Sequence, residues 1–234
     1  HKVSALPAPY LAVLHGDSEM IGEIVLDHYL LAGVHFTGGT DTFREIRWRV
    51  AQNEYKDVYK GFPRIVGETG GKDAIVVYDN HDPVSTAAAV AVGGFGAQGR
   101  KCSATSRMYM TPEMWERVKS PLQSFINHIQ VGDVADFRSY MGAIINEREY
   151  KKIVGYILRA KSDLVHNQNI IEIIGGQFSE SGGWFVWPTV IVTNDPQYVT
   201  VREEIFGPVV TIVVLPKEQF GKEALELCDS TSPY

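Results

Sequence analysis

The stretch "GVHFTGGTDTFREI", residues 33–46, indicates the fold class most directly. A short apolar segment runs into two glycines, and Thr40 or Asp41 can then cap a helix. A strand, a glycine turn and a helix in this order form a unit typical of nucleotide-binding α/β proteins. We therefore expect an α/β fold in which strands and helices alternate along the chain.

The flanking segments continue this alternation. Residues 11–46 as a whole predict strand, helix, strand and helix, with Asp17 or Ser18 as the first cap and Gly33 as the stop of the first helix. Further helices are expected near residues 84–92, 112–129 and 146–161, and further strands near 73–79, 106–111, 171–174, 188–193 and 209–215.

The composition is that of a globular protein and argues against several classes of function. The 234 residues are 44% hydrophobic and 21% charged, with a net charge of -6 and no block of basic residues. We therefore expect no nucleic acid as a partner. No apolar run approaches the roughly 18 residues that a membrane span needs, so no membrane association is expected. Two cysteines are too few for a disulfide framework, which indicates a reducing, intracellular environment.

One of these cysteines, Cys102, lies in "GRKCSATSR", residues 99–107. A lone free cysteine is usually a small buried hydrophobic side chain. Here Arg100 and Lys101 precede it, and their positive charge favours the thiolate, which is the nucleophilic form. Both interpretations stay open on these local features. Cys228, in an amphipathic helical segment, is expected to be structural.

Two further segments have an unusual composition. In "GETGGK", residues 67–72, Glu68 is either a solvated loop charge or part of a site. The glycine pair after it indicates that another group approaches the backbone closely. In "REEIFGP", residues 202–208, two acids precede an aromatic residue and a Gly-Pro turn, which alone is typical of an exposed turn.

A third segment, "GFGAQG" at residues 94–99, matches the dinucleotide-binding pattern G-x-G-x-x-G. That pattern requires a strand before it and a helix after it. Here a helix is expected before it and a strand soon after it, so we interpret the glycines as a tight loop that presents Cys102. The histidines show no metal-ligand spacing, and no metal site is expected.

Five segments in a fixed order resemble the aldehyde dehydrogenase superfamily: "HFTGG", "ETGGK", "GRKCSATSR", "GGWFVWPTVI" and "EEIFGP". The resemblance covers essentially the whole chain, and the spacing between Glu68 and Cys102 is similar to the family's spacing between base and nucleophile. Within the superfamily the chain most resembles the pyrroline-5-carboxylate (glutamate-γ-semialdehyde) dehydrogenase branch, through "FPRIVGETGGKDAIVV", "QGRKCSATSRMYM" and "ADFRSYMGAIINEREYKKI".

This resemblance implies a fold and a set of roles. Residues 1–70 would be the C-terminal part of a Rossmann-like NAD-binding domain, and residues 71–234 would be most of an α/β catalytic domain that bears the thiol. The implied site residues are Cys102 as nucleophile, Glu68 as general base, Thr37, Gly38 and Gly39 near the NAD phosphates and nicotinamide, Glu204 and Phe206 at the nicotinamide ribose, and Ser103 at the substrate.

The resemblance also implies an activity. It is the NAD-dependent oxidation of L-glutamate γ-semialdehyde, formed from 1-pyrroline-5-carboxylate, to L-glutamate in proline catabolism, through a cysteine thiohemiacetal and a thioester. The alternatives are another aldehyde dehydrogenase of the superfamily, or a truncated relative without activity. The implied partner is a small aldehyde, the full-length enzyme is expected to be a homo-oligomer, and the implied compartment is the mitochondrial matrix or, in a bacterium, the cytoplasm.

Some positions depart from the family pattern. Gly39 stands where a serine is usual, and Arg100 stands where a glutamine is usual. The family's segments that hold the adenosine ribose, the oxyanion asparagine and the substrate carboxylate have no counterpart here. We therefore expect this chain to be a fragment that is inactive alone.

Overall fold

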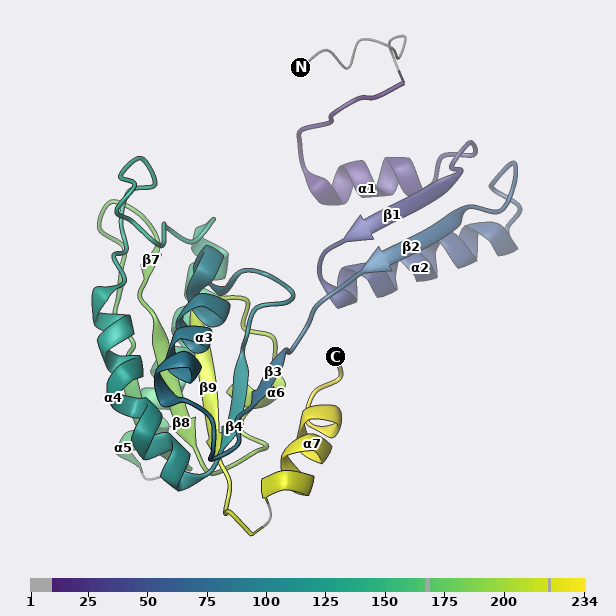
Figure 1. The fold of residues 1–234 in the computed structure, drawn as a ribbon. Coiled ribbons are helices and arrows are strands. Elements are labelled where there is room, and N and C mark those ends of the chain that lie inside the picture. Colours follow the sequence, from purple (N-terminus) through teal and green to yellow (C-terminus); the bar gives the residue numbers. More distant parts are fainter. Residues whose placement is uncertain (1–9, 167–168, 219) are drawn as a thin grey trace. The chain divides into compact units, whose positions relative to one another are not determined.

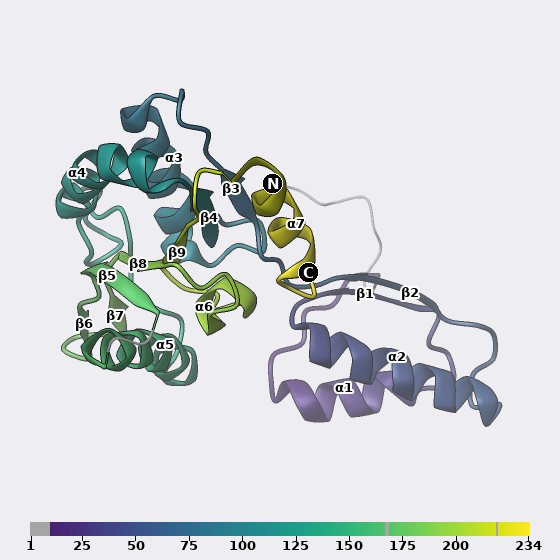
Figure 2. The same cartoon turned by 90° about the horizontal axis from the view of Figure 1, so that it is seen from below.

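The computed structural model describes residues 10–166, 169–218 and 220–234, and the chain divides into two compact units, His1–Thr69 and Gly70–Tyr234 (Figure 1). The first unit contains α1 (Ser18–Leu26), β1 (Gly33–Thr37), α2 (Thr40–Tyr55) and β2 (Arg64–Glu68). The two strands pair in parallel, and both helices lie on one face of them (Figure 2). The unit therefore has the strand-turn-helix arrangement that residues 33–46 predict.

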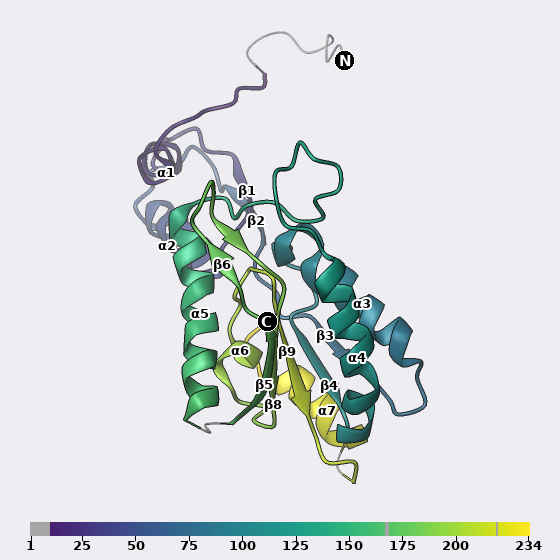
Figure 3. The ribbon, with the colours of Figure 1, turned by 90° about the vertical axis from the view of Figure 1, so that its left-hand side faces the viewer.

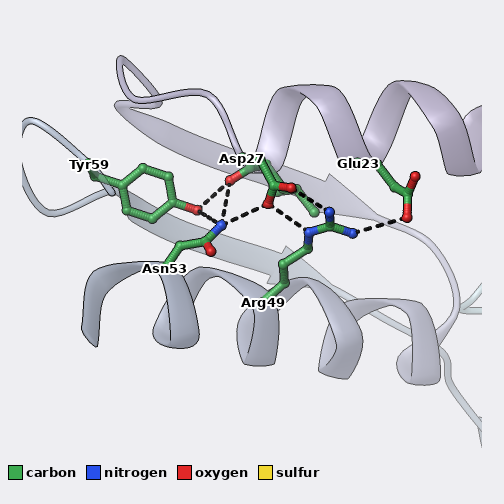
Figure 4. A network of polar contacts seen from close by, with 6 residues as sticks. Glu23, Asp27, Arg49, Asn53 and Tyr59 are labelled. Carbon is green, nitrogen blue, oxygen red and sulfur yellow. Dashed lines mark hydrogen bonds and ion pairs between the residues drawn. The ribbon is translucent and has the colours of Figure 1, made fainter. Parts of the chain in front are cut away.

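A polar network joins the two helices of the first unit (Figure 4). The Arg49 guanidinium on α2 donates to both Asp27 carboxylate oxygens, at 2.8 and 2.6 Å. The Asn53 side chain donates to Asp27 at 2.8 Å and to the Leu26 carbonyl at 3.2 Å, and the Tyr59 hydroxyl donates to that same carbonyl. The hydrogen bonds from Arg49 and Asn53 lower the pKa of Asp27 to about 2. The last carbonyl of α1 is thus satisfied by side chains rather than by a further helical turn.

The second unit is built on a five-stranded sheet with the order β3-β4-β9-β8-β5, in which only β5 is antiparallel to its neighbour. Its strands are β3 (Ala74–Val76), β4 (Arg107–Met110), β5 (Ile170–Gly175), β8 (Thr189–Thr193) and β9 (Val209–Val214), and β6 (Phe178–Ser179) pairs with β7 (Phe185–Val186). Its helices are α3 (Pro83–Phe95), the 3₁₀ turn η1 (Gly96–Gly99), α4 (Pro112–His128), α5 (Glu147–Val165), α6 (Val199–Arg202) and α7 (Phe220–Ser230).

Helices cover both faces of this sheet, α3 and α4 on one side and α5 on the other (Figure 3). The strand side chains alternate accordingly: Met108 and Ile212 belong to the cluster under α3 and α4, whereas Tyr109 and Val213 belong to the cluster under α5 and α7. A sheet buried on both faces needs apolar side chains at successive positions, which explains the continuous "VVTIVV" of β9.

Most of the predicted elements are confirmed in type and place, including α3, α4, α5 and five strands of the second unit's sheet. The strand expected at the start of residues 11–46 is wrong. Leu11, Val13 and Leu14 are exposed, and within the described residues no strand lies beside them to pair with. The expected stop at Gly33 is also wrong, because α1 ends at Leu26 and Gly33 begins β1. Conversely, β2 was not expected from the sequence.

Candidate active site

In the first unit, the structure brings the glycine turn at residues 37–39 next to Glu68. Thr37 and Glu68 end their strands side by side in the β1–β2 register. The Gly38 backbone N–H donates to the Glu68 carbonyl oxygen at 3.1 Å. Thr37, Gly38, Gly39 and Glu68 are all exposed. The two segments come from separate motifs, and parallel pairing of β1 with β2 is what joins them at one edge.

The turn at residues 37–39 leads directly into α2. Gly39 is the N-cap residue, without any side-chain cap, so the expected capping by Thr40 or Asp41 is wrong. The Thr40 hydroxyl oxygen is buried and has no hydrogen-bond partner. The first backbone N–H groups of a helix have no partner within it and carry partial positive charge. Because no side chain caps the start of α2, these N–H groups can donate to an anionic group such as a phosphate.

In the second unit, Cys102 lies in a tight turn with its side chain exposed. The Ala104 N–H donates to the Lys101 carbonyl at 3.1 Å, which closes the turn around Cys102 and Ser103. Three consecutive residues before it, Ala97 to Gly99, have positive φ angles of 52, 58 and 63°. The chain therefore leaves α3 through a sharp left-handed bend, and Cys102 and Ser103 both face solvent.

The glycine pair before β3 is the contact point between the Cys102 turn and the segment 203–207. A Cβ atom on Gly71 would overlap the carbonyl oxygen of Cys102, and one on Gly70 would overlap the carboxylate of Glu204. The Gly71 N–H donates to that carboxylate at 3.1 Å. The expectation that another group closely approaches these glycines is confirmed, and it is met by two groups. Only residues without side chains allow the backbone of Cys102 and an acid 102 positions later in the chain to pack against two adjacent residues.

Glu204 and Phe206 are half-buried, in a segment without regular structure between α6 and β9. Phe206 has a φ of 57°, in the left-handed region that a bulky side chain rarely adopts. The space between residues 203–207 and the Cys102 turn is only about 20 Å³, enough for about one water molecule. The two loops therefore form one closely packed surface.

Lys72 and Arg107 form a buried polar cluster that the sequence analysis missed. Lys72 is 4% exposed, and its ammonium nitrogen has no hydrogen-bond partner. Burial, with Arg107 nearby, lowers the pKa of Lys72 to about 7, although Glu204 and Glu203 oppose this shift. Arg107 donates to the carbonyls of Lys72 at 2.8 Å and of Cys228 at 2.7 Å. Nothing in "GGKDAIV" separates such a lysine from a solvated one, because the chain that covers it lies far away in the sequence.

Other features of the described residues do not form a competing site. Among them, no three His, Cys, Asp or Glu side chains gather in a way that could hold a metal ion. In the same part of the chain, no helix has both the length and the apolarity to cross a membrane. A larger hollow of about 680 Å³ is lined by Trp115, Ile171 and Lys217 among others, and it contains none of the candidate site residues.

The chain belongs to the aldehyde dehydrogenase family, because a model of that family matches residues 2–232. It is 39% identical over 231 residues to the mitochondrial Delta-1-pyrroline-5-carboxylate dehydrogenase of Dictyostelium discoideum and 38% identical over 232 residues to that of Danio rerio. Each match covers 99% of this chain and 40% of the relative. The chain therefore spans about two fifths of the length of these relatives.

Solved structures agree with this assignment. The Delta-pyrroline-5-carboxylate dehydrogenase from Mycobacterium tuberculosis bound with NAD matches with a TM-score of 0.83 at 36% identity, over 94% of this chain and 38% of that chain. The enzyme from Thermus with bound NAD matches with a TM-score of 0.78 at 30% identity, over 94% of this chain and 40% of that one. The predicted family and the predicted α/β fold are thereby confirmed.

Proposed function

We propose that the protein acts as an NAD-dependent aldehyde dehydrogenase that oxidises L-glutamate γ-semialdehyde, formed from 1-pyrroline-5-carboxylate, to L-glutamate in proline catabolism. The observation that carries the proposal is the packing of the Cys102 backbone carbonyl against Gly71 and of the Glu204 carboxylate against Gly70. These contacts bring the turn of an exposed nucleophile near a carboxylate that can accept hydrogen bonds from ribose hydroxyls. The relatives named above support the choice of substrate.

The chemistry assigned to Cys102 is nucleophilic. Its thiolate forms a bond to the aldehyde carbon and gives a thiohemiacetal, whose loss of hydride leaves a thioester. The backbone N–H of Cys102 is suited to stabilise the alkoxide oxygen, because a fixed donor is most effective where charge develops. Glu68 is assigned as the general base that takes a proton from the water that hydrolyses the thioester. Ser103, exposed in the same turn, is assigned to the substrate.

Each unit, taken by itself, has residues that suit a part of NAD. In the first unit, the exposed turn of Thr37, Gly38 and Gly39 before α2, a helix start without a side-chain cap, suits the phosphates. In the second unit, the Glu204 carboxylate and the Phe206 ring suit the nicotinamide ribose. When bound, NAD supplies the hydride acceptor. We accordingly propose that residues 1–70 are the end of the NAD-binding domain and residues 71–234 most of the catalytic domain.

The wider setting follows from the same proposal. The full-length enzyme is expected to be a homo-oligomer that works on a small aldehyde. Relatives from eukaryotes carry the word "mitochondrial" in their names, so we propose the mitochondrial matrix for a eukaryotic source and the cytoplasm for a bacterial one.

The test is a turnover assay on the full-length product of the gene with glutamate γ-semialdehyde and NAD. Cys102→Ala should lower kcat by on the order of 10³-fold or more, whereas Cys228→Ala should leave it nearly unchanged. Glu68→Gln should give one burst of NADH per active site and then slow turnover, since only hydrolysis needs the base.

The remaining outcomes distinguish the alternatives. Turnover of other aldehydes in preference to the semialdehyde would point to another member of the superfamily. Full activity of Cys102→Ala would refute the assignment of Cys102 as the nucleophile. No activity of the parent protein, together with equally slow alkylation of both cysteines, would favour a relative without activity.

A further inference from the structure

We propose that Arg100 is a positioning residue that fixes the turn at Phe206 and thereby shapes the nicotinamide end of the NAD site. The inference rests on the proposed function, because that function assigns Phe206 and Glu204 to the cofactor. Arg100 lies two residues before Cys102. Its contacts in this chain define its role.

Arg100 holds Phe206 in two ways. Its guanidinium donates to the Phe206 carbonyl oxygen at 2.9 Å, and it lies over the Phe206 ring, 4.8 Å from the ring centroid. A planar cation can make both contacts at once, with its edge as donor and its face on the ring. One side chain thus fixes both the backbone and the ring of the same residue.

Arg100 is itself held in place by α5. Its guanidinium forms an ion pair with Glu149 at 3.6 Å, and the two side chains are only 18% and 17% exposed. Glu149 lies in the first turn of α5, and its backbone N–H donates to the Asn146 side chain at 2.9 Å. The carboxylate is thus anchored by a capped helix end. Because the pair is mostly shielded from solvent, it is less weakened by salt than a surface pair.

Phe206 is a residue that needs such a restraint. Its φ of 57° is disfavoured for a side chain with a Cβ atom, and residues in such conformations persist only where their surroundings determine them. Without the donor at its carbonyl and the cation on its ring, the turn can relax toward an ordinary backbone conformation. That relaxation would move both the ring and the neighbouring Glu204.

Among the described residues, the other side-chain hydrogen bonds to this segment do not reach Phe206. On α5, the Lys152 ammonium donates to the Glu204 carbonyl at 3.1 Å, and the Tyr156 hydroxyl donates to the Glu203 carboxylate at 2.5 Å. These two contacts secure residues 203 and 204 only. Arg100 is the side chain that extends the support to residue 206, and it does so from the turn of the nucleophile.

The backbones of the two loops also meet at this point. Gly99 has a φ of 63°, and a Cβ atom on it would overlap the Gly207 carbonyl oxygen. Gly207 in turn has no room for a side chain, because Ile153 of α5 packs against it. Arg100 therefore lies where the nucleophile turn, the cofactor turn and α5 converge, and a change in one loop is transmitted to the other through it.

The experiment compares Arg100→Gln and Arg100→Lys with a matched control, Arg148→Gln, in the full-length product of the gene. Arg148 contacts the same carboxylate, Glu149, at 3.3 Å, but its side chain is 88% exposed. The measurements are the Kd for NAD by calorimetry, hydrogen exchange of residues 203–208, and kcat with KM for NAD and for the aldehyde.

For Arg100→Gln we expect faster exchange of residues 203–208 and a Kd for NAD raised about tenfold, the size expected for a lost hydrogen bond from a charged donor. The KM for NAD should rise while the KM for the aldehyde changes little. Arg100→Lys keeps the charge and one donor and should restore part of the affinity. Arg148→Gln should match the parent protein in every measurement.

Two results would overturn the inference. One is an unchanged Kd for NAD in Arg100→Gln while the parent protein binds NAD; the other is an equal effect of Arg148→Gln. Should Arg100→Gln fail to fold, the test uses Arg100→Lys alone. NAD affinity and hydrogen exchange equal to those of the parent protein in Arg100→Lys would then contradict the role of the Arg100 guanidinium. Absence of NAD binding to the parent protein would refute the proposed function and this inference with it. Measuring the parent protein first distinguishes this outcome from an effect of the variants.

Discussion

Replacing Lys72 by methionine should remove a pH dependence from the stability of the second unit. The lysine is 4% exposed, and its ammonium nitrogen has no hydrogen-bond partner. Burial and the neighbouring Arg107 lower its pKa from 10.5 to about 7. In the unfolded chain the amine regains its ordinary value. Between pH 7 and about 10.5 the unfolded state therefore binds one more proton than the folded state, so the free energy of unfolding rises with pH over that range.

The magnitude follows from the size of this shift. One pKa unit corresponds to about 1.4 kcal/mol, so the full displacement amounts to roughly 5 kcal/mol, an upper value because buried sites relax. Between pH 7.5 and 9.5 the contribution should grow by about 2–3 kcal/mol. Lys72→Met keeps an unbranched side chain of similar length but cannot titrate. Its stability relative to the parent protein should therefore fall by that amount as the pH rises over this interval.

The assay is urea unfolding at several pH values, in which the difference between parent and variant cancels the other titrating groups. Lys151→Met is the control, because Lys151 forms an exposed ion pair with Glu147 on the surface of α5. It should show no such trend over the same interval. A difference between Lys72→Met and the parent that stays constant with pH would mean that Lys72 carries its proton in the folded protein, and the argument from burial would be refuted.

Three further predictions concern single contacts. Gly71→Ala should displace the turn of Cys102, because a backbone carbonyl fills the space of the new methyl group. The expected loss of stability is about 1–3 kcal/mol, and an unchanged melting temperature in thermal unfolding would contradict it. Iodoacetamide should alkylate Cys102 well before Cys228, because Cys102 is exposed while burial raises the pKa of Cys228. Mass spectrometry of samples taken at intervals measures the order, and faster alkylation of Cys228 would contradict the prediction. Asn53→Ala should destabilise the first unit by about 1–3 kcal/mol, since it removes donors to Asp27 and to the end of α1. Hydrogen exchange of α1 should become faster, and unchanged exchange would show that the network does not stabilise this helix.

The sequence predicts those elements whose signals are local. The predicted cap Asp17 accepts a hydrogen bond from the backbone N–H three residues further on. Thr111 and Asn146, at the starts of two predicted helical segments, accept hydrogen bonds of the same kind. The strand expected from Leu11 carries apolar residues but has no partner strand among the described residues. β2 carries the mixed sequence "RIVGE" and is a strand because β1 lies beside it. Whether each of these two segments forms a strand thus depends on a neighbouring strand to pair with, and pairing is not a local property of the sequence.

In the candidate site, too, local features are predictable from the sequence and contacts between distant residues are not. The glycine pair at residues 70 and 71 correctly predicts a close approach, because the absence of side chains is visible in the sequence. Which groups approach was not predictable from the residues themselves: the bond from Gly71 to Glu204 joins positions 133 apart. The burial of Lys72 was missed for the same reason.

The segment 203–207 illustrates why such distant contacts matter for binding. It has no regular structure after α6, and a flexible loop of this kind loses affinity because ordering it opposes binding. In this segment Tyr156 and Lys152 bind residues 203 and 204, Arg100 binds residue 206, and Gly71 donates to the Glu204 carboxylate. These contacts reduce the ordering that a ligand would have to impose. Two of these contacts come from α5, and the other two come from the loops before β3 and before Cys102. Arg100 therefore supports the segment to which we assign the nicotinamide ribose. Variants at this position test that role, because loss of the support should change NAD affinity while the alkylation rate of Cys102 stays the same.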